Sequence, residues 1–294
     1  MLNALTIDVE DYYHVAVFTS TIQRRDWDQY ESRVEQNVNR LMDILDEYRT
    51  RATFFILGWV AERHPQLIRA IQKRGHEVAS HGYAHQCIYT QTPEQFRQET
   101  RRSKQLLEDA IGRPILGYRA ASYSITQQSL WALEILQEEG FLYDSSIFPI
   151  HHDRYGIPGY SRFCHLVNGR AEVGLVEFPP STVRLGGINI PIAGGGYFRI
   201  YPYAFTRWGI RHLNTTEHQP TVVYLHPWEI DPEQPRIPAK ALSRFRQYYN
   251  LDQTAPRLIR LLQDFTFGTM ASVLSEQGLL KTPGDGSIVR QMDR

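Results

Sequence analysis

Short apolar segments alternate with amphipathic ones in the first part of the chain, and no other feature constrains the fold as strongly. Residues 4–8 and 52–58 are apolar segments typical of buried strands, and a third strand is expected in the glycine-led segment 75–79. Between them, residues 32–48 place apolar side chains at helical spacing, and a helix is expected over 65–74. This succession predicts a parallel sheet with helices packed outside it.

The alternation continues through the middle of the chain. A charged helix is expected over 93–111, because a proline stands at its start and a glycine directly after its end. Strands over 115–118 and 141–144 flank a second amphipathic helix over 129–139. Residues 221–225 form the clearest strand of the sequence. The chain is therefore expected to belong to the α/β class.

Charge and cysteine content argue against several classes of protein. With 32 basic and 32 acidic residues the formal net charge is zero, so no overall field favours nucleic acid or an anionic bilayer. The two cysteines, Cys87 and Cys164, do not make a disulfide framework, and free thiols suit a reducing compartment. We see no signal peptide and no apolar stretch of the roughly twenty residues that span a bilayer. These features predict a cytoplasmic protein without a nucleic-acid partner or a transmembrane segment.

Two histidines, His81 and His85, follow the third predicted strand. Imidazoles four residues apart converge on one metal ion when the backbone between them makes a helical turn. A chain with 11 histidines also places two at this spacing by chance. Their position at a strand end favours the metal interpretation, because catalytic residues of α/β barrels gather at that edge. A catalytic zinc usually takes three protein ligands and one water, so a carboxylate from elsewhere is expected to complete the set.

Other predicted strands also end in polar residues. The first strand ends in the acidic cluster 8–11, although a solvated acidic turn has the same appearance. A lone arginine such as Arg119 is most often a surface residue, but at the end of a barrel strand it can pair with a carboxylate. Because the carboxyl ends of parallel strands meet at one edge, we expect a single site there. Its candidate residues are Asp8, Glu10, His81, His85, Arg119, Asp144 and His226.

Three motifs resemble those of a known family. They are Thr-Phe-Phe-Ile-Leu-Gly over 53–58, Ser-His-Gly-Tyr-Ala-His over 80–85 and Leu-His-Pro over 225–227. They are similar to motifs of the polysaccharide deacetylases of the NodB-homology group, carbohydrate esterase family four. The resemblance implies a distorted (β/α) barrel with a bound divalent metal that hydrolyses N-acetyl groups of glycans. Within the group, the motifs over 8–14 and 143–146 and the tail motif beginning at Arg244 resemble a branch associated with bacterial exopolysaccharide and PEP-CTERM clusters.

The resemblance implies a set of metal ligands. His81 and His85 correspond to the two histidine ligands of the family. The family's carboxylate ligand has no direct counterpart, because Val9 occupies its position. Glu10 is the expected replacement, since residues two apart on a strand point to the same side, and Asp11 is the alternative if the strand ends earlier. Zn²⁺ is the expected ion, which lowers the pKa of bound water to about 7 and polarises a carbonyl oxygen.

The resemblance also implies roles in proton transfer. Asp8 corresponds to the general base and Arg119 to the arginine that braces it. His226 corresponds to the general acid and Asp144 to the acid that orients it. Ala121 stands where many members have proline, a departure that removes no reacting group. These roles suit amide hydrolysis, because a water must lose a proton and the departing amine must gain one.

The resemblance to the family covers the expected barrel domain, residues 1–230. Within it, residues 151–205 are rich in glycine and proline, which predicts a loop and hairpin insertion over the mouth of the site. A mainly helical extension over 231–281 is expected to pack against the barrel, and 282–294 are expected to form a flexible tail.

Two other functions are compatible with the same motifs. One is a hydrolase of another carbon–nitrogen bond, in a small cyclic amide or ureide, and the other is an inactive glycan-binding protein. Aromatic residues of the insertion favour a glycan, because they can stack on sugar rings, although core aromatics have the same pattern. An N-acetylated glycan is therefore the expected partner, and the sequence leaves open whether copies form a homo-oligomer. The aromatic residues concerned are Tyr197, Phe198, Tyr201 and Tyr203.

Overall fold

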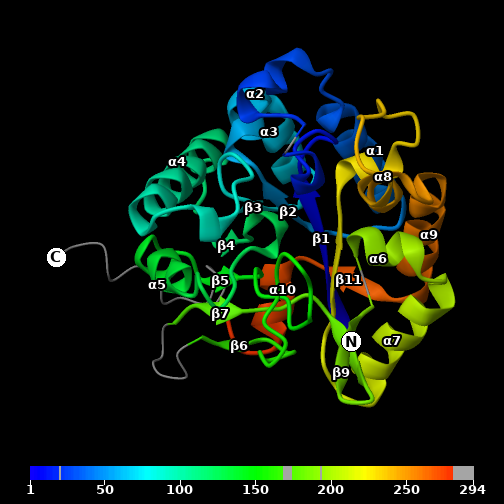
Figure 1. Cartoon of the computed structure of the whole chain (residues 1–294). Helices are drawn as coiled ribbons and strands as arrows, with labels where there is room; N and C mark the ends of the chain where they lie inside the picture. The colour runs from blue at the N-terminus through cyan, green and yellow to red at the C-terminus, as the bar shows by residue number, and fades with distance from the viewer. Residues whose placement is uncertain (20, 168–173, 193, 281–294) are drawn as a thin grey trace.

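A computed structural model gives the fold of residues 1–19, 21–167, 174–192 and 194–280 (Figure 1). One large sheet lies at its centre, with the strand order β10-β1-β2-β3-β4-β5-β7-β6 and with β11 also paired to β1. Its pairings are parallel except the one between β6 and β7. The strands are β1 (Leu2–Val9), β2 (Thr53–Ile56), β3 (Glu77–Ser80), β4 (Gly117–Tyr118), β5 (Tyr143–Asp144), β6 (His165–Leu166), β7 (Val176–Glu177), β10 (Val222–Leu225) and β11 (Thr266–Gly268).

The sheet is curled into a distorted, open barrel. Its path ends at β10 on one side and at β6 on the other, and the helices lie around its outside (Figure 1). The α/β class and the distorted barrel expected from the sequence are thereby confirmed. The helices are α1 (Val34–Glu47), α2 (Gly58–Arg63), α3 (Pro65–Lys73), α4 (Pro93–Ile111), α5 (Trp131–Glu138), α6 (Gly195–Ile200), α7 (Tyr203–Thr215), α8 (Ala241–Tyr248), α9 (Leu251–Asp264) and α10 (Met270–Glu276).

The central strands are buried along nearly their whole length. All four residues of β2 are buried, as are seven of the eight residues of β1. Parallel strands that are covered on both faces need continuous apolar sequence rather than alternation. This is why the apolar segments of the sequence indicate strands here, and why the polar residues that follow them mark the edge of the sheet.

Helix α4 has the boundaries that its sequence predicts. The side chain of Thr92 accepts a hydrogen bond from the backbone of Gln95, whose own side chain accepts from the backbone of Thr92, so the two form a capping box. Pro93 occupies the first turn, where its missing N–H costs nothing. Gly112 ends the helix with a φ of 66°, in the left-handed region that favours glycine.

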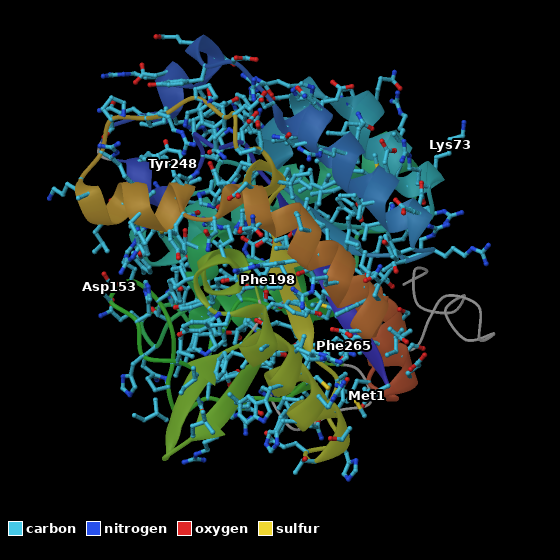
Figure 2. All side chains as sticks on the ribbon, turned by 90° about the vertical axis from the view of Figure 1, so that its right-hand side faces the viewer. Met1, Lys73, Asp153, Phe198, Tyr248 and Phe265 are labelled. Atoms are coloured by element: carbon cyan, nitrogen blue, oxygen red, sulfur yellow. The ribbon has the colours of Figure 1, made fainter. Side chains whose placement is uncertain are left out.

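The C-terminal segment differs from the helical extension that the sequence predicts. Residues 266–268 form β11, which pairs in parallel with residues 2–4 of β1, so this segment contributes to the central sheet. A strand of three residues is too short to show a periodic pattern, and its partner is distant in sequence. The apolar face of α9 is buried as expected, with Leu258 and Leu261 fully inaccessible. Figure 2 shows α8, which ends at Tyr248, and α9, which ends just before Phe265, on the outside of the molecule.

The expected insertion contains more regular structure than a loop and a hairpin. The hairpin is present, formed by β8 (Thr182–Leu185) and β9 (Ile188–Pro191). However, β7 belongs to the central sheet, α6 follows the hairpin, and α7 begins within the segment at Tyr203.

Within the described part of the chain, no helix is both long and apolar enough to cross a membrane. The predicted tail over 282–294 lies outside the described residues.

Candidate active site

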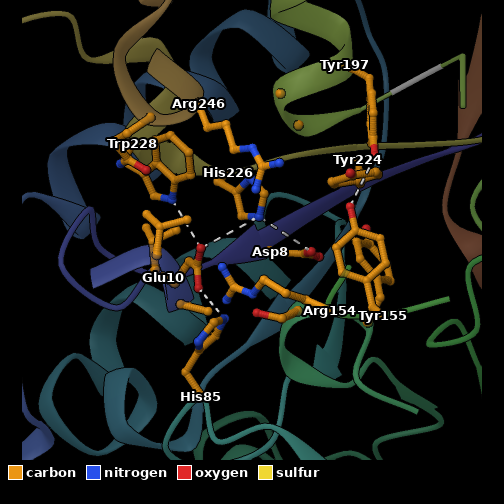
Figure 3. A pocket seen from close by; sticks show the side chains of 18 of the residues that line it. Asp8, Glu10, His85, Arg154, Tyr155, Tyr197, Tyr224, His226, Trp228 and Arg246 are labelled. Carbon is orange, nitrogen blue, oxygen red and sulfur yellow. Dashed lines mark hydrogen bonds and ion pairs between the residues drawn. The ribbon is translucent and has the colours of Figure 1, made fainter. Parts of the chain in front are cut away.

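The polar residues at the ends of the strands surround one cavity of about 390 Å³ (Figure 3). Asp8 lies near the end of β1, and Glu10 directly follows this strand. His81 directly follows β3, and His226 directly follows β10. The sequence-based expectation that the ends of separate strands form one site therefore agrees with this arrangement.

Asp8 is held by Arg119, which follows β4. Both side chains are almost fully buried, and Arg119 Nη1 donates to Asp8 Oδ1 at 2.7 Å. The guanidinium also donates to Thr6 Oγ1 at 2.7 Å and to the hydroxyl and carbonyl of Ser145 at 2.9 and 3.2 Å. Because these bonds replace the water that burial removes, the guanidinium is held in a fixed orientation. Asp8 Oδ1 is thereby engaged, and Oδ2 lies 3.9 Å from Nε2 of His226.

Glu10, His81 and His85 form a cluster that could hold a metal ion. One ligand atom from each of these buried residues lies within 4.8 Å of the other two, and Glu10 Oε2 is 2.8 Å from His85 Nε2. His81 Nδ1 lies 2.9 Å from the carbonyl oxygen of Arg119, so that it donates its proton there and leaves Nε2 free as a ligand. Glu10 Oε2 is buried without a hydrogen-bond partner among the described residues. These donors fit a zinc-type ion.

Burial and charge favour the protonation states that such a cluster needs. Burial is the main influence on His81 and lowers its pKa to about 4, so the imidazole is neutral near pH 7. Burial would raise the pKa of Glu10, but the adjacent His85, 2.8 Å away, together with the charge of His226, lowers it well below the usual value. A neutral imidazole and an ionised carboxylate are the forms that bind metals.

The two histidines do not converge through a helical turn, as the sequence-based interpretation assumed. No helix lies between His81 and His85, and the chain bends there instead. Gly82 has a φ of 72° and His85 a φ of 49°, both in the left-handed region. For a residue with a side chain this backbone conformation is uncommon and carries strain, which the surrounding structure must hold in place. The spacing of four is therefore met by a bend, with the ring centroids 5.5 Å apart.

The structure favours Glu10 over Asp11 as the carboxylate of the cluster. Asp11 accepts hydrogen bonds from the Ser32 hydroxyl at 2.7 Å and from the backbone N–H groups of Arg33 and Val34 at 3.1 and 3.3 Å. It therefore caps the N-terminus of α1, where a carboxylate also interacts favourably with the helix dipole. The two carboxylate oxygens of Asp11 are therefore used to cap α1, away from the histidine pair.

His226 is oriented by Glu229 and not by Asp144, so that part of the sequence-based prediction is wrong. Glu229 lies in the short 3-10 helix Pro227–Ile230 and accepts from Nδ1 of His226. Its second carboxylate oxygen is 2.8 Å from Nε of Arg199. Burial lowers the pKa of His226, but the hydrogen bond and charge of Glu229, followed by the charges of Glu10 and Asp8, raise it to about 9. The signal in the sequence was a carboxylate three residues after the histidine, separated from it by a helix-starting proline.

Asp144 belongs to a second buried pair. It lies opposite Glu177 in the register of β5 and β7, and Ser146 donates to it at 2.5 Å. Burial raises the pKa of Asp144 to about 6. Burial and the nearby charge of Asp144 raise the pKa of Glu177 well above its usual value. Two neighbouring buried carboxyl groups favour a shared proton, because ionising both would place two negative charges side by side away from water, at a high free-energy cost.

Aromatic residues form much of the wall of the cavity. Tyr197 of α6 lines it beside Tyr155, and their hydroxyls are 3.3 Å apart (Figure 3). Trp228 lies on the other side and donates from Nε1 to Glu10 Oε1 at 3.1 Å. The expectation of exposed stacking residues is not met by Phe198, which is fully buried, or by Tyr203, which is also buried. The segment 151–205 thus supplies part of the wall of the site, through Tyr155 and Tyr197.

Two family profiles match the sequence. Residues 26–139 match polysaccharide deacetylase, and residues 145–275 match a domain of unknown function, DUF3473. The peptidoglycan deacetylase of Helicobacter pylori is 30% identical over 119 residues, which are 40% of this chain and 39% of that protein. The chain spans between 32% and 39% of the length of the first curated relatives that it matches.

Solved structures resemble the whole fold. A Mycobacterium smegmatis protein assigned to the polysaccharide deacetylases is 25% identical, with a TM-score of 0.61, over 95% of this chain and 93% of that one. An allantoinase, Puue, has a TM-score of 0.61 at 13% identity, over 95% of this chain and 91% of that one, which is a likeness of fold alone. The matching profile places a polysaccharide deacetylase domain in residues 26–139, and the relatives and the fold of the whole chain resemble the proteins of that family.

Proposed function

We propose that this protein is a metal-dependent N-deacetylase acting on N-acetylhexosamine units of a polysaccharide or of its precursor. The observation that carries the proposal is the meeting, in one cavity, of a possible metal cluster with two separately held proton-transfer groups. Asp8 is held by Arg119 on one side, and His226 is held by Glu229 on the other. Amide hydrolysis needs this combination of electrophile, base and acid.

Glu10, His81 and His85 are the proposed metal ligands, and Zn²⁺ is the proposed ion, because two imidazoles and one carboxylate are a common catalytic zinc set. When bound, such an ion polarises the acetyl carbonyl and lowers the pKa of a bound water to about 7. The chain positions its own ligands for this task. Trp228 holds one oxygen of Glu10 and leaves the other directed at His85.

The proton transfers follow from the remaining contacts. Asp8 accepts the proton of the attacking water at Oδ2, since Oδ1 is held by Arg119. His226 carries a proton on Nε2 near neutral pH and donates it to the amide nitrogen as the carbon–nitrogen bond breaks. Glu229 keeps the proton of Nδ1 and so fixes the orientation of the ring. The products are acetate and a free amino sugar.

Acetate release from N-acetylglucosamine oligomers tests the proposal. Purified protein should release acetate, lose this activity with a chelator and regain it with added Zn²⁺. His81→Ala should lose both metal and activity, whereas His218→Asn, at an exposed position, should retain both. A metal-loaded protein that binds these oligomers without releasing acetate would instead be a glycan-binding protein. Turnover of a cyclic ureide in place of the oligomers would indicate the other carbon–nitrogen hydrolase.

We further propose that the protein acts in bacterial exopolysaccharide biosynthesis, a role that rests on the sequence resemblance. Deletion of the gene should raise the acetyl content of the secreted polymer, and a copy with Asp8→Asn should not reverse the change. An unchanged acetyl content in the deletion strain would exclude this role without affecting the acetate-release result.

A further inference from the structure

The cavity contains two arginines that the proposed deacetylation leaves unused. Arg154 of the insertion and Arg246 of α8 line it, and Figure 3 shows both side chains directed into it from opposite walls. The other arginines of the site are paired, because Arg119 binds Asp8 and Arg199 binds Glu229. Over the described ranges of the chain, neither Arg154 nor Arg246 has a carboxylate oxygen within 4.0 Å.

These two guanidinium groups leave positive charge without a partner in the cavity. Each is only partly exposed, so solvent does not fully replace a missing anion. The acidic residues of the cavity are engaged elsewhere, Asp8 with Arg119 and Glu10 with Trp228 and the histidine cluster. Guanidinium groups bind carboxylate and phosphate through paired, charge-assisted hydrogen bonds. The missing counter-charge is therefore expected to come with the ligand.

The cavity also has polar aromatic residues that suit a sugar. Tyr155 stacks on His152 with ring centroids 3.8 Å apart and planes 13° apart, and its hydroxyl is within 3.3 Å of that of Tyr197. The faces of Tyr155 are therefore covered by His152 and Phe148, and the two neighbouring tyrosine hydroxyls are the groups that can bind the hydroxyls of a sugar ring. A cavity of about 390 Å³ lies within the roughly 300–1,000 Å³ range of small-ligand sites. The cavity therefore combines tyrosine hydroxyls with two arginines that can bind an anion.

We propose that the natural substrate carries an oxyanion close to its acetamido sugar, and that Arg154 and Arg246 bind this group. The inference rests on the proposed deacetylation and names its substrate class more closely. The oxyanion is a carboxylate if the neighbouring residue is a uronic acid, and a phosphate if the substrate is a sugar phosphate precursor. In both cases the anion selects the substrate, while the residues proposed for the deacetylation perform the chemistry.

Binding measurements test the inference without requiring turnover. Calorimetry is done with N-acetylglucosamine, N-acetylglucosamine 1-phosphate and a disaccharide of N-acetylglucosamine and glucuronic acid. At low salt at least one anionic probe should bind about 10-fold or more tightly than its neutral counterpart, and this preference should shrink as salt rises. The tighter of the two anionic probes identifies which oxyanion the site takes. Equal affinity for neutral and anionic probes would overturn the inference.

Variants assign the preference to the two arginines. Arg154→Gln and Arg246→Gln should each reduce the anionic-to-neutral ratio of affinities from about 10-fold or more toward one, because each removes charge-assisted hydrogen bonds to the oxyanion. Arg244→Gln, at an exposed position of the same helix, is the matched control and should keep the wild-type ratio. Melting temperatures check that each variant is folded. An unchanged ratio in both cavity variants would mean that another group, such as a bound metal, holds the anion.

Kinetics separate this inference from the proposed function. If the wild type releases acetate equally well from neutral and anionic substrates, the deacetylase proposal stands and the oxyanion inference fails. If it binds anionic sugars through Arg154 and Arg246 but releases no acetate from any of them, the inference about the ligand stands and the deacetylase proposal fails. If both variants lower kcat/KM by the same factor on neutral and anionic substrates, the arginines serve catalysis or folding, and the inference is wrong.

Discussion

Replacing Glu229 with glutamine tests how the protonation of the proposed general acid is set. Glu229 accepts from Nδ1 of His226, and its other oxygen is bound by Arg199. Burial lowers the pKa of His226, but Glu229, with added contributions from Glu10 and Asp8, raises it to about 9. Glutamine keeps the shape and an oxygen acceptor but removes the negative charge. The variant therefore changes the charge next to the histidine with little change in packing.

The expected effect depends strongly on pH. With a pKa of about 9, His226 is roughly nine-tenths protonated at pH 8, whereas at its ordinary value of 6.5 about 3% is protonated. Glu229→Gln should therefore lower kcat/KM for acetate release about 30-fold at pH 8 and less than about twofold at pH 6. The loss is larger at pH 8 because His226 with a lowered pKa gives up its proton at a lower pH. The pH at which kcat/KM falls on the alkaline side therefore moves toward neutrality. A bound dication acts on His226 in both proteins, so their comparison isolates Glu229.

The assay is kcat/KM for acetate release across roughly pH 5.5 to 9.5 in the wild type and the variant. Glu233→Gln, at an exposed position a few residues further along, is the control and should follow the wild-type profile. Melting temperatures check folding, because Arg199 also loses an ionic partner in the variant. An equal loss of activity at pH 6 and pH 8 in a folded variant would refute the reasoning. Glu229 would then act by holding the ring in place and not by its charge.

Three further predictions concern the base, the second carboxyl pair and the C-terminal packing. Asp8→Asn should keep its metal but lose roughly 10²- to 10⁴-fold in turnover, measured by metal content and acetate release, and full activity would exclude Asp8 as the base. Because burial and Asp144 raise the pKa of Glu177, its contribution to stability is present below the ordinary value of 4.5 and is lost as pH rises through the folded value. Urea unfolding from about pH 5 to 8 should thus show a flatter pH dependence in Glu177→Gln than in the wild type, and identical slopes would contradict this. Leu258→Ala should cost about 2–5 kcal/mol of unfolding free energy in the same assay, against little change for the exposed control Gln263→Ala, and equal effects would disprove a packed α9.

Residues that follow a strand directly could be predicted from the sequence. Asp8, His81 and His226 each lie at or directly after the end of an apolar segment. Because strands alternate with helices, the strands are parallel and their carboxyl ends meet at one edge of the sheet. Arg119 follows the same rule. Its partner could also be predicted, because β1 and β4 both end at this edge and the arginine side chain is long enough to reach Asp8.

Contacts that depend on the exact path of a loop could not be predicted in the same way. Asp144 also ends a strand, but its neighbour in the sheet is Glu177, so it lies within the carboxyl pair and not beside His226. Glu229 reaches His226 only because the chain turns at once into a 3-10 helix. His85 depends on a left-handed backbone conformation that no periodic pattern reveals. Local turn geometry, and not hydrophobic patterning, decides these three positions.

Two buried arginines hold the proposed base and the proposed acid of one cavity. Arg119 binds Asp8 directly and fixes the carboxylate in its position. Arg199 binds Glu229, which stays ionised and in turn favours the protonated form of His226. One cation therefore supports a base by direct contact, and the other supports an acid through an intervening carboxylate.

The second of these arginines makes the C-terminal segment part of the site. Arg199 is almost fully buried, and besides Glu229 it donates to the backbone carbonyls of Arg246, Gln247 and Tyr249 at 2.7, 3.2 and 2.7 Å. Without these carbonyls the guanidinium would lose most of its hydrogen bonds in a buried position, at a high free-energy cost. The end of α8 thus stabilises the cation that holds Glu229, and it also carries the Arg246 side chain into the cavity. Arg199, Glu229 and α8 all lie within residues 145–275, the range that matches the second family profile.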